Sequence, residues 1–262
     1  LLTQNYPLIH AVGRASAEAP RLLRMSWGDP SAQRVTLIGK GVCFDTGGLD
    51  LKPSAGMRLM KKDMGGAAHA LALAQIIMDA KLNVRLDVFI PAVENSVSSD
   101  AFRPGDIIKS RKGLTVEIDN TDAEGRLILA DALARACEDN PVLVLDFATL
   151  TGAARTALGP DIPPFFTSDD ALASEFASAS TETSDPIWRL PMWDAYDGDM
   201  DTPVADIKNT GDGAMAGAIY GALFLRRFVT TSVWAHFDVY AWAPKEKPAR
   251  PQGGEAQARG QH

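Results

Sequence analysis

Residues 120–127 of this chain read Asn-Thr-Asp-Ala-Glu-Gly-Arg-Leu and place two carboxylates, Asp122 and Glu124, two residues apart. A strand-like segment precedes this run and a helix-like segment follows it, so the backbone turns there and can offer carbonyl oxygens as well. Oxygen ligands of this kind suit one divalent cation or a pair of them. The run therefore predicts a metal centre, and we interpret the chain as a metal-dependent hydrolase.

Two upstream residues, Lys40 and Asp45, could complete a two-metal centre. Lys40 ends the apolar run at residues 35–39, and Asp45 lies five residues further on, before two glycines. A neutral lysine amine can coordinate a metal, because desolvation and a nearby cation both lower a lysine pKa. Taken alone, each residue also has a structural interpretation, as a lysine that reaches solvent or an aspartate in a turn.

Lys52 and Asp63 are further candidates with equally ordinary alternatives. Lys52 lies in a loop-like run before Pro53, where a lysine is usually solvated. Asp63 comes just before an Ala-rich, helix-like run, where an aspartate commonly caps the helix. Each of these residues is a stronger candidate together with the others than alone.

The composition is that of a globular α/β domain. Of the 262 residues, 46% are hydrophobic and 23% are charged, and the net charge is −7. An acidic chain of this kind argues against non-specific binding to nucleic acid or to an anionic membrane. Two cysteines are too few for a disulfide framework or a cysteine zinc site. No apolar run approaches the ~20 residues needed to cross a bilayer, and we expect a cytoplasmic protein.

Strand-like and helix-like stretches alternate, which predicts an α/β fold with helices on both faces of a mixed, largely parallel sheet, a three-layer α/β/α sandwich. There is no repeat or low-complexity linker, so we expect one domain over residues 1–262. We expect strands over residues 35–39, 84–93, 114–118, 142–147 and 233–239. We expect helices over residues 67–80, 127–138, 168–179 (with Ser168 as N-cap) and 216–228.

The candidate residues follow the predicted strands. Lys40, Asp45, the 120–127 run and residues 149–152 each come after a strand-like segment. Because ligands bind at the carboxyl ends of the strands in such sheets, we expect these residues to meet at one edge. His236, inside the last predicted strand, is interpreted as a core histidine.

Several short motifs occur along the chain in a fixed order and with characteristic gaps. They are KG at 40–41, FDTGG at 44–48, KPS at 52–54, KDM at 62–64, RPGD at 103–106, NTDAEGRL at 120–127, ATLTG at 148–152, DIKNTG at 206–211 and WAHFD at 234–238. In these motifs the chain resembles the catalytic domain of the leucyl (cytosol) aminopeptidases, peptidase family M17. The run at 120–127 matches the signature octapeptide of that family.

The resemblance implies a role for each candidate residue. Two divalent metal ions, Mn²⁺ or Zn²⁺ with Mg²⁺ or Co²⁺ as further options, would be held by Lys40, Asp45, Asp63, Asp122 and Glu124. Lys52 would be the catalytic lysine, and Arg126 would hold a bicarbonate ion that serves as general base. The residues implied to line the side-chain pocket or to contact the substrate are Met60, Asn120, Thr149 and Gly152.

The implied chemistry is coherent in charge and mechanism. Three Asp and one Glu carry a formal charge of −4, which two divalent cations match, whereas buried carboxylates alone would be very unfavourable. A pair of cations acidifies a bridging water, polarises the scissile carbonyl and takes the free α-amine of the peptide. Lys52 would add positive charge for the gem-diolate. The enzyme would then release only the first residue.

We therefore expect an aminopeptidase that prefers leucine and other hydrophobic N-terminal residues, assembled as a homo-hexamer. Under this resemblance we expect the usual N-terminal domain of the family to be absent from residues 1–262, and residues 1–30 to form the entry segment after its linker. Tyr240 stands where many relatives have a small residue, which would reshape the substrate pocket. The alternatives are a dipeptidase with the same chemistry, for example on Cys-Gly, and a DNA-binding regulatory relative. The lack of a basic stripe argues against DNA binding.

Overall fold

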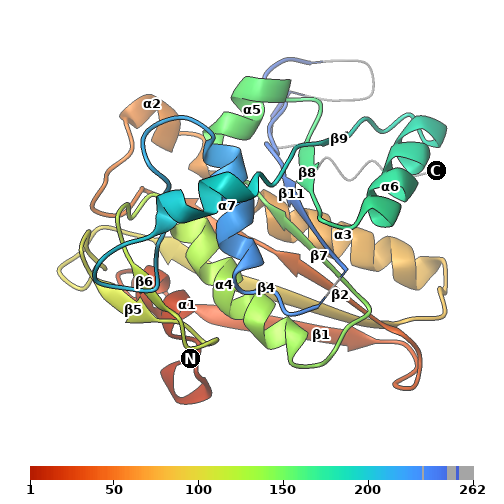
Figure 1. Cartoon of the computed structure of the whole chain (residues 1–262), viewed down its shortest axis with the longest axis horizontal. Coiled ribbons are helices and arrows are strands. Elements are labelled where there is room, and N and C mark those ends of the chain that lie inside the picture. Colours follow the sequence, from red (N-terminus) through yellow and green to blue (C-terminus); the bar gives the residue numbers. More distant parts are fainter. Residues whose placement is uncertain (232, 247–251, 254–262) are drawn as a thin grey trace.

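The structure is a computed structural model that describes residues 1–231, 233–246 and 252–253. A sheet of eight strands runs through its centre (Figure 1). The strands are β1 (Arg21–Trp27), β2 (Arg34–Gly39), β3 (Gly41–Asp45), β4 (Arg85–Asn95), β7 (Leu143–Ala148), β8 (Pro164–Phe166), β9 (Trp188–Arg189) and β11 (Trp234–Asp238). Their order across the sheet is β1-β4-β2-β7-β11-β8-β9, and β3 pairs with β4 beside this path.

The central strands β4, β2, β7 and β11 are parallel to one another, whereas β1 and β8 pair antiparallel with β4 and β11. The sheet is therefore mixed and mostly parallel, which confirms the prediction. Its central strands are rich in buried apolar residues, as expected for strands covered on both faces. Each parallel connection crosses over through a helix, and the carboxyl ends of these strands therefore lie at the same edge.

The helices form one layer on each face of the sheet. They are α1 (Pro7–Gly13), α2 (Ser54–Met57), α3 (Gly65–Asp79), α4 (Glu124–Cys137), α5 (Gly152–Leu158), α6 (Asp170–Glu182) and α7 (Gly217–Arg226), with 3₁₀ turns η1 (Leu2–Gln4), η2 (Met60–Lys62) and η3 (Asp194–Met200). One hydrophobic cluster joins α1, α4 and α7 to one sheet face, and another joins α3 and α6 to the opposite face (Figure 1). Neighbouring residues of β2 point to opposite faces, since Ile38 belongs to the first hydrophobic cluster and Leu37 to the second. The architecture is the predicted α/β/α sandwich.

Three elements lie outside this sandwich and form a small sheet in the order β10-β6-β5. They are β5 (Ile107–Lys109), β6 (Thr115–Glu117) and β10 (Ile207–Lys208). The strand expected at residues 114–118 is β6, so that segment is a strand but does not belong to the main sheet.

Two other expectations differ in detail from the structure. Ser168 was the expected cap of α6, but Asp169 caps it, because the Asp169 carboxylate accepts a 2.9 Å hydrogen bond from the Leu172 amide three residues on. Helix α4 begins at Glu124, three residues earlier than expected, so the first turn of α4 contains part of the octapeptide. A carboxylate is favourable there because it faces the positive end of the helix dipole.

His236 is fully buried on β11, as expected of a core histidine. Its Nδ1 lies 2.5 Å from an oxygen of Asp146, its register partner on β7. The other Asp146 oxygen accepts a hydrogen bond from the Trp234 indole. The histidine is thus part of the sheet core. No helix among the described residues has the length and apolar character needed to span a bilayer.

Candidate metal centre

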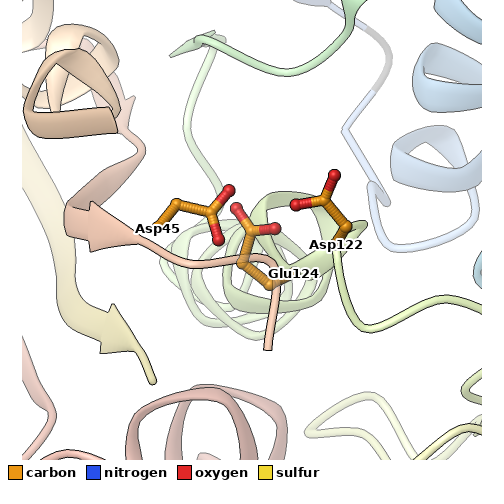
Figure 2. Close-up of side chains that lie close together, drawn as sticks. All are labelled: Asp45, Asp122 and Glu124. Atoms are coloured by element: carbon orange, nitrogen blue, oxygen red, sulfur yellow. The ribbon is translucent and has the colours of Figure 1, made fainter. Parts of the chain in front are cut away.

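The candidate ligands meet at the carboxyl edge of the parallel strands. Lys40 directly follows β2, Asp45 ends β3, and Asp63 lies between η2 and α3. Asp122 and Glu124 lie at the start of α4. Carboxylate oxygens of Asp45, Asp122 and Glu124 come within 4.8 Å of one another, and Figure 2 shows the three groups converging. Residues almost 80 positions apart in the chain are therefore brought together, as expected, although β6, the strand before Asp122 and Glu124, belongs to the small sheet and not to the main one.

Lys40 is buried and connects two of the carboxylates. Its Nζ lies 2.8 Å from Asp63 Oδ2 and 2.8 Å from Glu124 Oε1, and it donates a 3.0 Å hydrogen bond to the Thr149 carbonyl. Burial lowers the pKa of Lys40, but the charges of Asp63, Glu124 and Asp45 outweigh burial and raise it above the ordinary value. Without other cations nearby, Lys40 is an ammonium.

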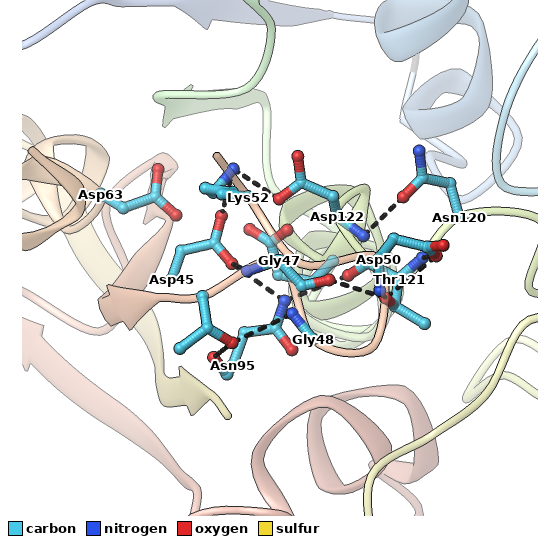
Figure 3. A network of polar contacts seen from close by, with 12 residues as sticks. Asp45, Gly47, Gly48, Asp50, Lys52, Asp63, Asn95, Asn120, Thr121 and Asp122 are labelled. Carbon is cyan, nitrogen blue, oxygen red and sulfur yellow. Dashed lines mark hydrogen bonds and ion pairs between the residues drawn. The ribbon is translucent and has the colours of Figure 1, made fainter. Parts of the chain in front are cut away.

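Lys52 connects the other two carboxylates. Its Nζ lies 2.9 Å from Asp45 Oδ2 and forms an ion pair with Asp122 Oδ1 (Figure 3). Burial lowers the pKa of Lys52 as well, and the charge of Asp45 and the contact with Asp122 raise it further than burial lowers it. The four carboxylates thus share two ammonium groups.

Asp45 is held in place by donors from the protein. Its Oδ1 accepts hydrogen bonds of 2.8 Å from the Gly47 amide and 2.9 Å from Asn95 Nδ2. Asn95 also donates to the Thr121 carbonyl, so one amide group fixes two loops. Gly47 has φ +87°, a backbone conformation that suits glycine, and this brings its amide towards the carboxylate. Asn95 was missed by the sequence reasoning, although its place at the end of β4 could have suggested it.

The remaining carboxylates need more positive charge than two lysines supply. Burial and the charge of Asp45 raise the pKa of Glu124 to about 8. Burial likewise raises the pKa of Asp63 and of Asp122. In the described part of the chain, three buried oxygens (Asp63 Oδ2, Asp122 Oδ1 and Glu124 Oε1) accept no hydrogen bond, although they face lysine ammonium groups. Four carboxylate side chains and one amine make a donor set that suits two hard or borderline divalent cations.

Arg126 is a buried cation close to this cluster. Its Nη1 donates a 2.7 Å hydrogen bond to the Asn209 carbonyl, and its Nε has no hydrogen-bond partner among the described residues. Burial lowers the pKa of Arg126 to about 10, against the opposing charges of Asp238 and Glu124. A buried guanidinium with an unused donor fits a small anion, because carboxylate-like oxygens match its geometry.

Asn209, which lies outside the octapeptide in the sequence, holds its backbone through hydrogen bonds. It was not predicted as a functional residue. Its Oδ1 accepts hydrogen bonds from the amides of Asp119 and Asn120, and its Nδ2 donates to the Asn120 carbonyl at 2.7 Å. The Asn120 side chain in turn accepts a 2.7 Å bond from the Asp122 amide. Asn209 lies within the motif at 206–211, so that motif was the available signal.

A cavity of about 530 Å³ opens onto the candidate ligands. It is lined by Lys40, Asp45, Asp63 and Asp122 and by both predicted catalytic residues, Lys52 and Arg126. The predicted substrate residues Met60, Asn120, Thr149 and Gly152 line it too. Glu124 lies beneath the surface of the cavity, 1% exposed. All eleven predicted residues therefore lie in or directly behind one cavity.

Comparisons with known proteins agree with this arrangement. The model of the cytosol aminopeptidase family, catalytic domain, matches residues 1–261. A probable cytosol aminopeptidase of Syntrophotalea carbinolica is 45% identical over 255 residues, which are 96% of this chain and 51% of that protein. One from Chlamydia trachomatis serovar A is 44% identical over 256 residues, again 96% and 51%. The chain spans about half the length of the curated relatives it matches.

Solved structures give the same result. The crystal structure of a cytosol aminopeptidase from Coxiella burnetii is 54% identical, with a TM-score of 0.96 over 98% of this chain and 57% of that one. The bottromycin maturation enzyme BotP in complex with Mn is 40% identical, with a TM-score of 0.92 over 98% and 58%. With a family match along nearly its whole length and this fold, the chain belongs to the cytosol aminopeptidase family.

Proposed function

We propose that this chain is the catalytic part of a two-metal aminopeptidase that releases N-terminal amino acids, leucine and other hydrophobic residues among them, from peptides. One observation carries the proposal: Asp45, Asp122 and Glu124 converge within 4.8 Å at the floor of a cavity, in a chain of this family. Pockets at the carboxyl edge of a parallel sheet are the usual place for an active site.

The metal ligands would be shared between two positions. Lys40, Asp45, Asp63 and Glu124 would hold the tighter ion, and Asp45, Asp122 and Glu124 the more exchangeable one. The ion pairs support this division, since Lys40 joins Asp63 to Glu124 while Lys52 joins Asp45 to Asp122. Lys40 would give up its ammonium proton on becoming a ligand, because a divalent cation beside it lowers its pKa. Mn²⁺ and Zn²⁺ suit these donors, with Mg²⁺ and Co²⁺ as further options; the manganese complex of BotP is a precedent within the fold.

The protein side chains would supply orientation and charge for peptide hydrolysis. Bound divalent cations contribute an acidified water and a polarised scissile carbonyl. Lys52, held at the cavity wall between two carboxylates, would stabilise the negative charge that develops on the carbonyl oxygen. Arg126, which lines the cavity as a cation with an unpartnered donor, would hold bicarbonate, and the bound anion would supply a general base.

Substrate contacts would come from the cavity wall. Met60, Asn120, Thr149 and Gly152 line it, and they are the candidates for the side-chain pocket and for hydrogen bonds to the peptide. The free α-amine of the substrate would reach the metal position, which limits cleavage to the first residue.

The test is hydrolysis of leucine p-nitroanilide by metal-stripped protein, before and after Mn²⁺ or Zn²⁺ is restored. N-acetyl-leucine p-nitroanilide is the control, because acetylation removes the amine. We expect metal-dependent cleavage of the free-amine substrate alone. Equal cleavage of the acetylated compound, or full activity after metal removal, would refute the proposal.

A further inference from the structure

One wall of the cavity carries two cations that the proposed chemistry does not use. We define this basic wall as Lys62, Arg155 and Tyr240, all of which line the cavity. Lys62 ends η2, Arg155 lies in α5, and Tyr240 comes two residues after the end of β11. The basic wall is thus assembled from three separate segments around the cavity that contains the candidate metal ligands.

The side chain of Tyr240 contacts both cations, Lys62 and Arg155. Arg155 Nη1 donates a 3.0 Å hydrogen bond to the Tyr240 hydroxyl, and its guanidinium carbon lies 4.8 Å from the centre of the Tyr240 ring. The Lys62 ammonium lies 5.0 Å from the same ring centre. Cations at these distances are attracted by the ring quadrupole. The aromatic residue therefore orients two positive groups that would otherwise repel each other.

Lys62 and Arg155 differ from Lys40 and Lys52, because neither forms an ion pair with a carboxylate of the described residues. Lys40 and Lys52 each contact two carboxylates. Lys62 and Arg155 form no ion pair within the described residues, and the cation–ring contacts and the side-chain hydrogen bond that they make there are with Tyr240. Asp63, the sequence neighbour of Lys62, directs its carboxylate to Lys40 and Thr149 instead.

The charge of the residues that line the cavity also favours an anionic ligand. Two divalent cations would balance the candidate carboxylates, with Lys40 neutral. The charged residues that remain in the cavity lining are then all cationic, namely Lys52, Lys62, Arg126 and Arg155. A concave site lined by one sign of charge concentrates ligands of the opposite sign, even though this chain carries a net charge of −7.

We propose that the basic wall receives a carboxylate of the substrate, and that this carboxylate belongs to the side chain of an N-terminal glutamate or aspartate. The inference rests on the proposed function. Lys62 lies two residues from Met60 on η2, and Arg155 lies three residues from Gly152 on α5, so both cations border the candidate side-chain pocket. The enzyme would accept acidic first residues in addition to leucine.

The experiment compares kcat/KM for the 7-amido-4-methylcoumarin derivatives of glutamate, glutamine and leucine, on metal-loaded protein. Glutamine matches glutamate in shape without its charge. We expect the wild type to prefer glutamate to glutamine, and Lys62→Met and Arg155→Met each to lower that ratio by about tenfold, as for loss of one charge-assisted contact. The leucine rate should stay within about twofold, and Lys62→Arg should retain the preference.

Lys61→Met is the matched control. Lys61 is the neighbouring lysine on η2, but its ammonium lies 5.7 Å from the Trp242 ring centre and it does not line the cavity. This variant should leave all three rates unchanged. An equal loss for every substrate in Lys62→Met and Arg155→Met would indicate a structural role and overturn the proposal.

The remaining outcomes separate the possible failures. A wild type that cleaves the leucine substrate but shows no glutamate preference overturns the basic-wall assignment and leaves the aminopeptidase standing. Failure to cleave any of the three refutes the proposed function itself. A second pair of substrates, Leu-Gly and its C-terminal amide, tests whether the basic wall binds the C-terminal carboxylate of a peptide instead. If the variants lose discrimination only in that pair, the basic wall binds a peptide C-terminus and the side-chain assignment is wrong.

Discussion

Gly125 lies in the first turn of α4, directly against the side chain of Lys40. A Cβ atom at this position would lie 2.6 Å from Lys40 Cε and 2.8 Å from its Nζ. The amine must pass this point to reach Glu124, so the absence of a side chain at residue 125 is what admits the lysine. Gly125, which has no side chain of its own, therefore determines where the amine of Lys40 can lie.

We expect Gly125→Ala to weaken Mn²⁺ binding by about tenfold or more, because Lys40 would be pushed out of place. The fold should survive, since alanine favours a helix over glycine by roughly 1 kcal/mol. Calorimetric titration of metal-stripped protein would measure the affinity. Gly56→Ala is the control, because a Cβ there meets nothing within 4 Å. Equal affinities in the two variants would contradict the steric argument.

At the scale of elements, α1 depends on a side chain from another helix. Its N-cap, Tyr6, makes no capping hydrogen bond with its side chain. The buried carboxylate of Asp131 on α4 instead accepts hydrogen bonds from the amides of Leu8 and Ile9, at 2.8 and 3.3 Å, and from the Arg111 amide at 2.8 Å. Asp131 thereby joins α1, α4 and the loop before β6.

Asp131→Ala should destabilise the protein by roughly 2–4 kcal/mol, because three backbone donors lose their acceptor. Urea unfolding would measure the free energy. Asp79→Ala, at an exposed aspartate on α3, should change it by less than about 0.5 kcal/mol. The candidate metal centre is not part of this contact, so activity per folded molecule should be retained. A stability equal to that of the control would show that water replaces the carboxylate.

The cross-strand pair of His236 and Asp146 predicts a dependence of stability on pH. Burial lowers the pKa of His236, but the charge and hydrogen bond of Asp146 raise it above its ordinary value of about 6.5. The folded state therefore binds the proton more tightly than the unfolded state. The resulting stabilisation is complete below about pH 6.5 and is lost as the pH rises through the folded pKa.

Unfolding free energies of the wild type and of His236→Gln, measured from pH 6 to pH 9 with a chelator present, would test this. The advantage of the wild type should shrink as the pH rises. An advantage that grows with pH would mean that the buried histidine is neutral throughout.

For the whole molecule, the candidate metal ligands come from separate segments between residues 40 and 124, so metal binding there should stabilise the folded state as a whole. At a free Mn²⁺ concentration about 100 times the dissociation constant, one site adds roughly 2.7 kcal/mol. For a domain of this size that corresponds to a rise in Tm of roughly 5–10 °C. Thermal scans with and without metal would measure it, and Glu124→Gln should reduce the rise. An unchanged Tm in the wild type would argue that no metal binds.

Much of the fold and of the site could be predicted from the sequence. Apolar runs located β2, β4, β7 and β11 because buried parallel strands are apolar on both faces, and motif spacing identified the residues that line the cavity. Strand β1 was missed because its residues are mostly exposed and show no clear alternation. The positions of Asn95, at the end of β4, and of Asn209, within the motif at 206–211, were visible in the sequence, but their partners were not, since hydrogen bonds between distant segments leave no periodic signal. The hexamer and the assigned catalytic roles stay predictions.

The support that Asn209 gives to the octapeptide has a consequence for protein engineering. The octapeptide is easily recognised in the sequence, yet its backbone is held by Asn209, almost 90 positions away. Its carboxylates lie beside Asp45 on β3, and Lys40 links Glu124 to Asp63. It is therefore not an autonomous module. A peptide excised around residues 120–127 would keep the sequence and lose the site, and grafting it into another protein would require the surrounding scaffold as well.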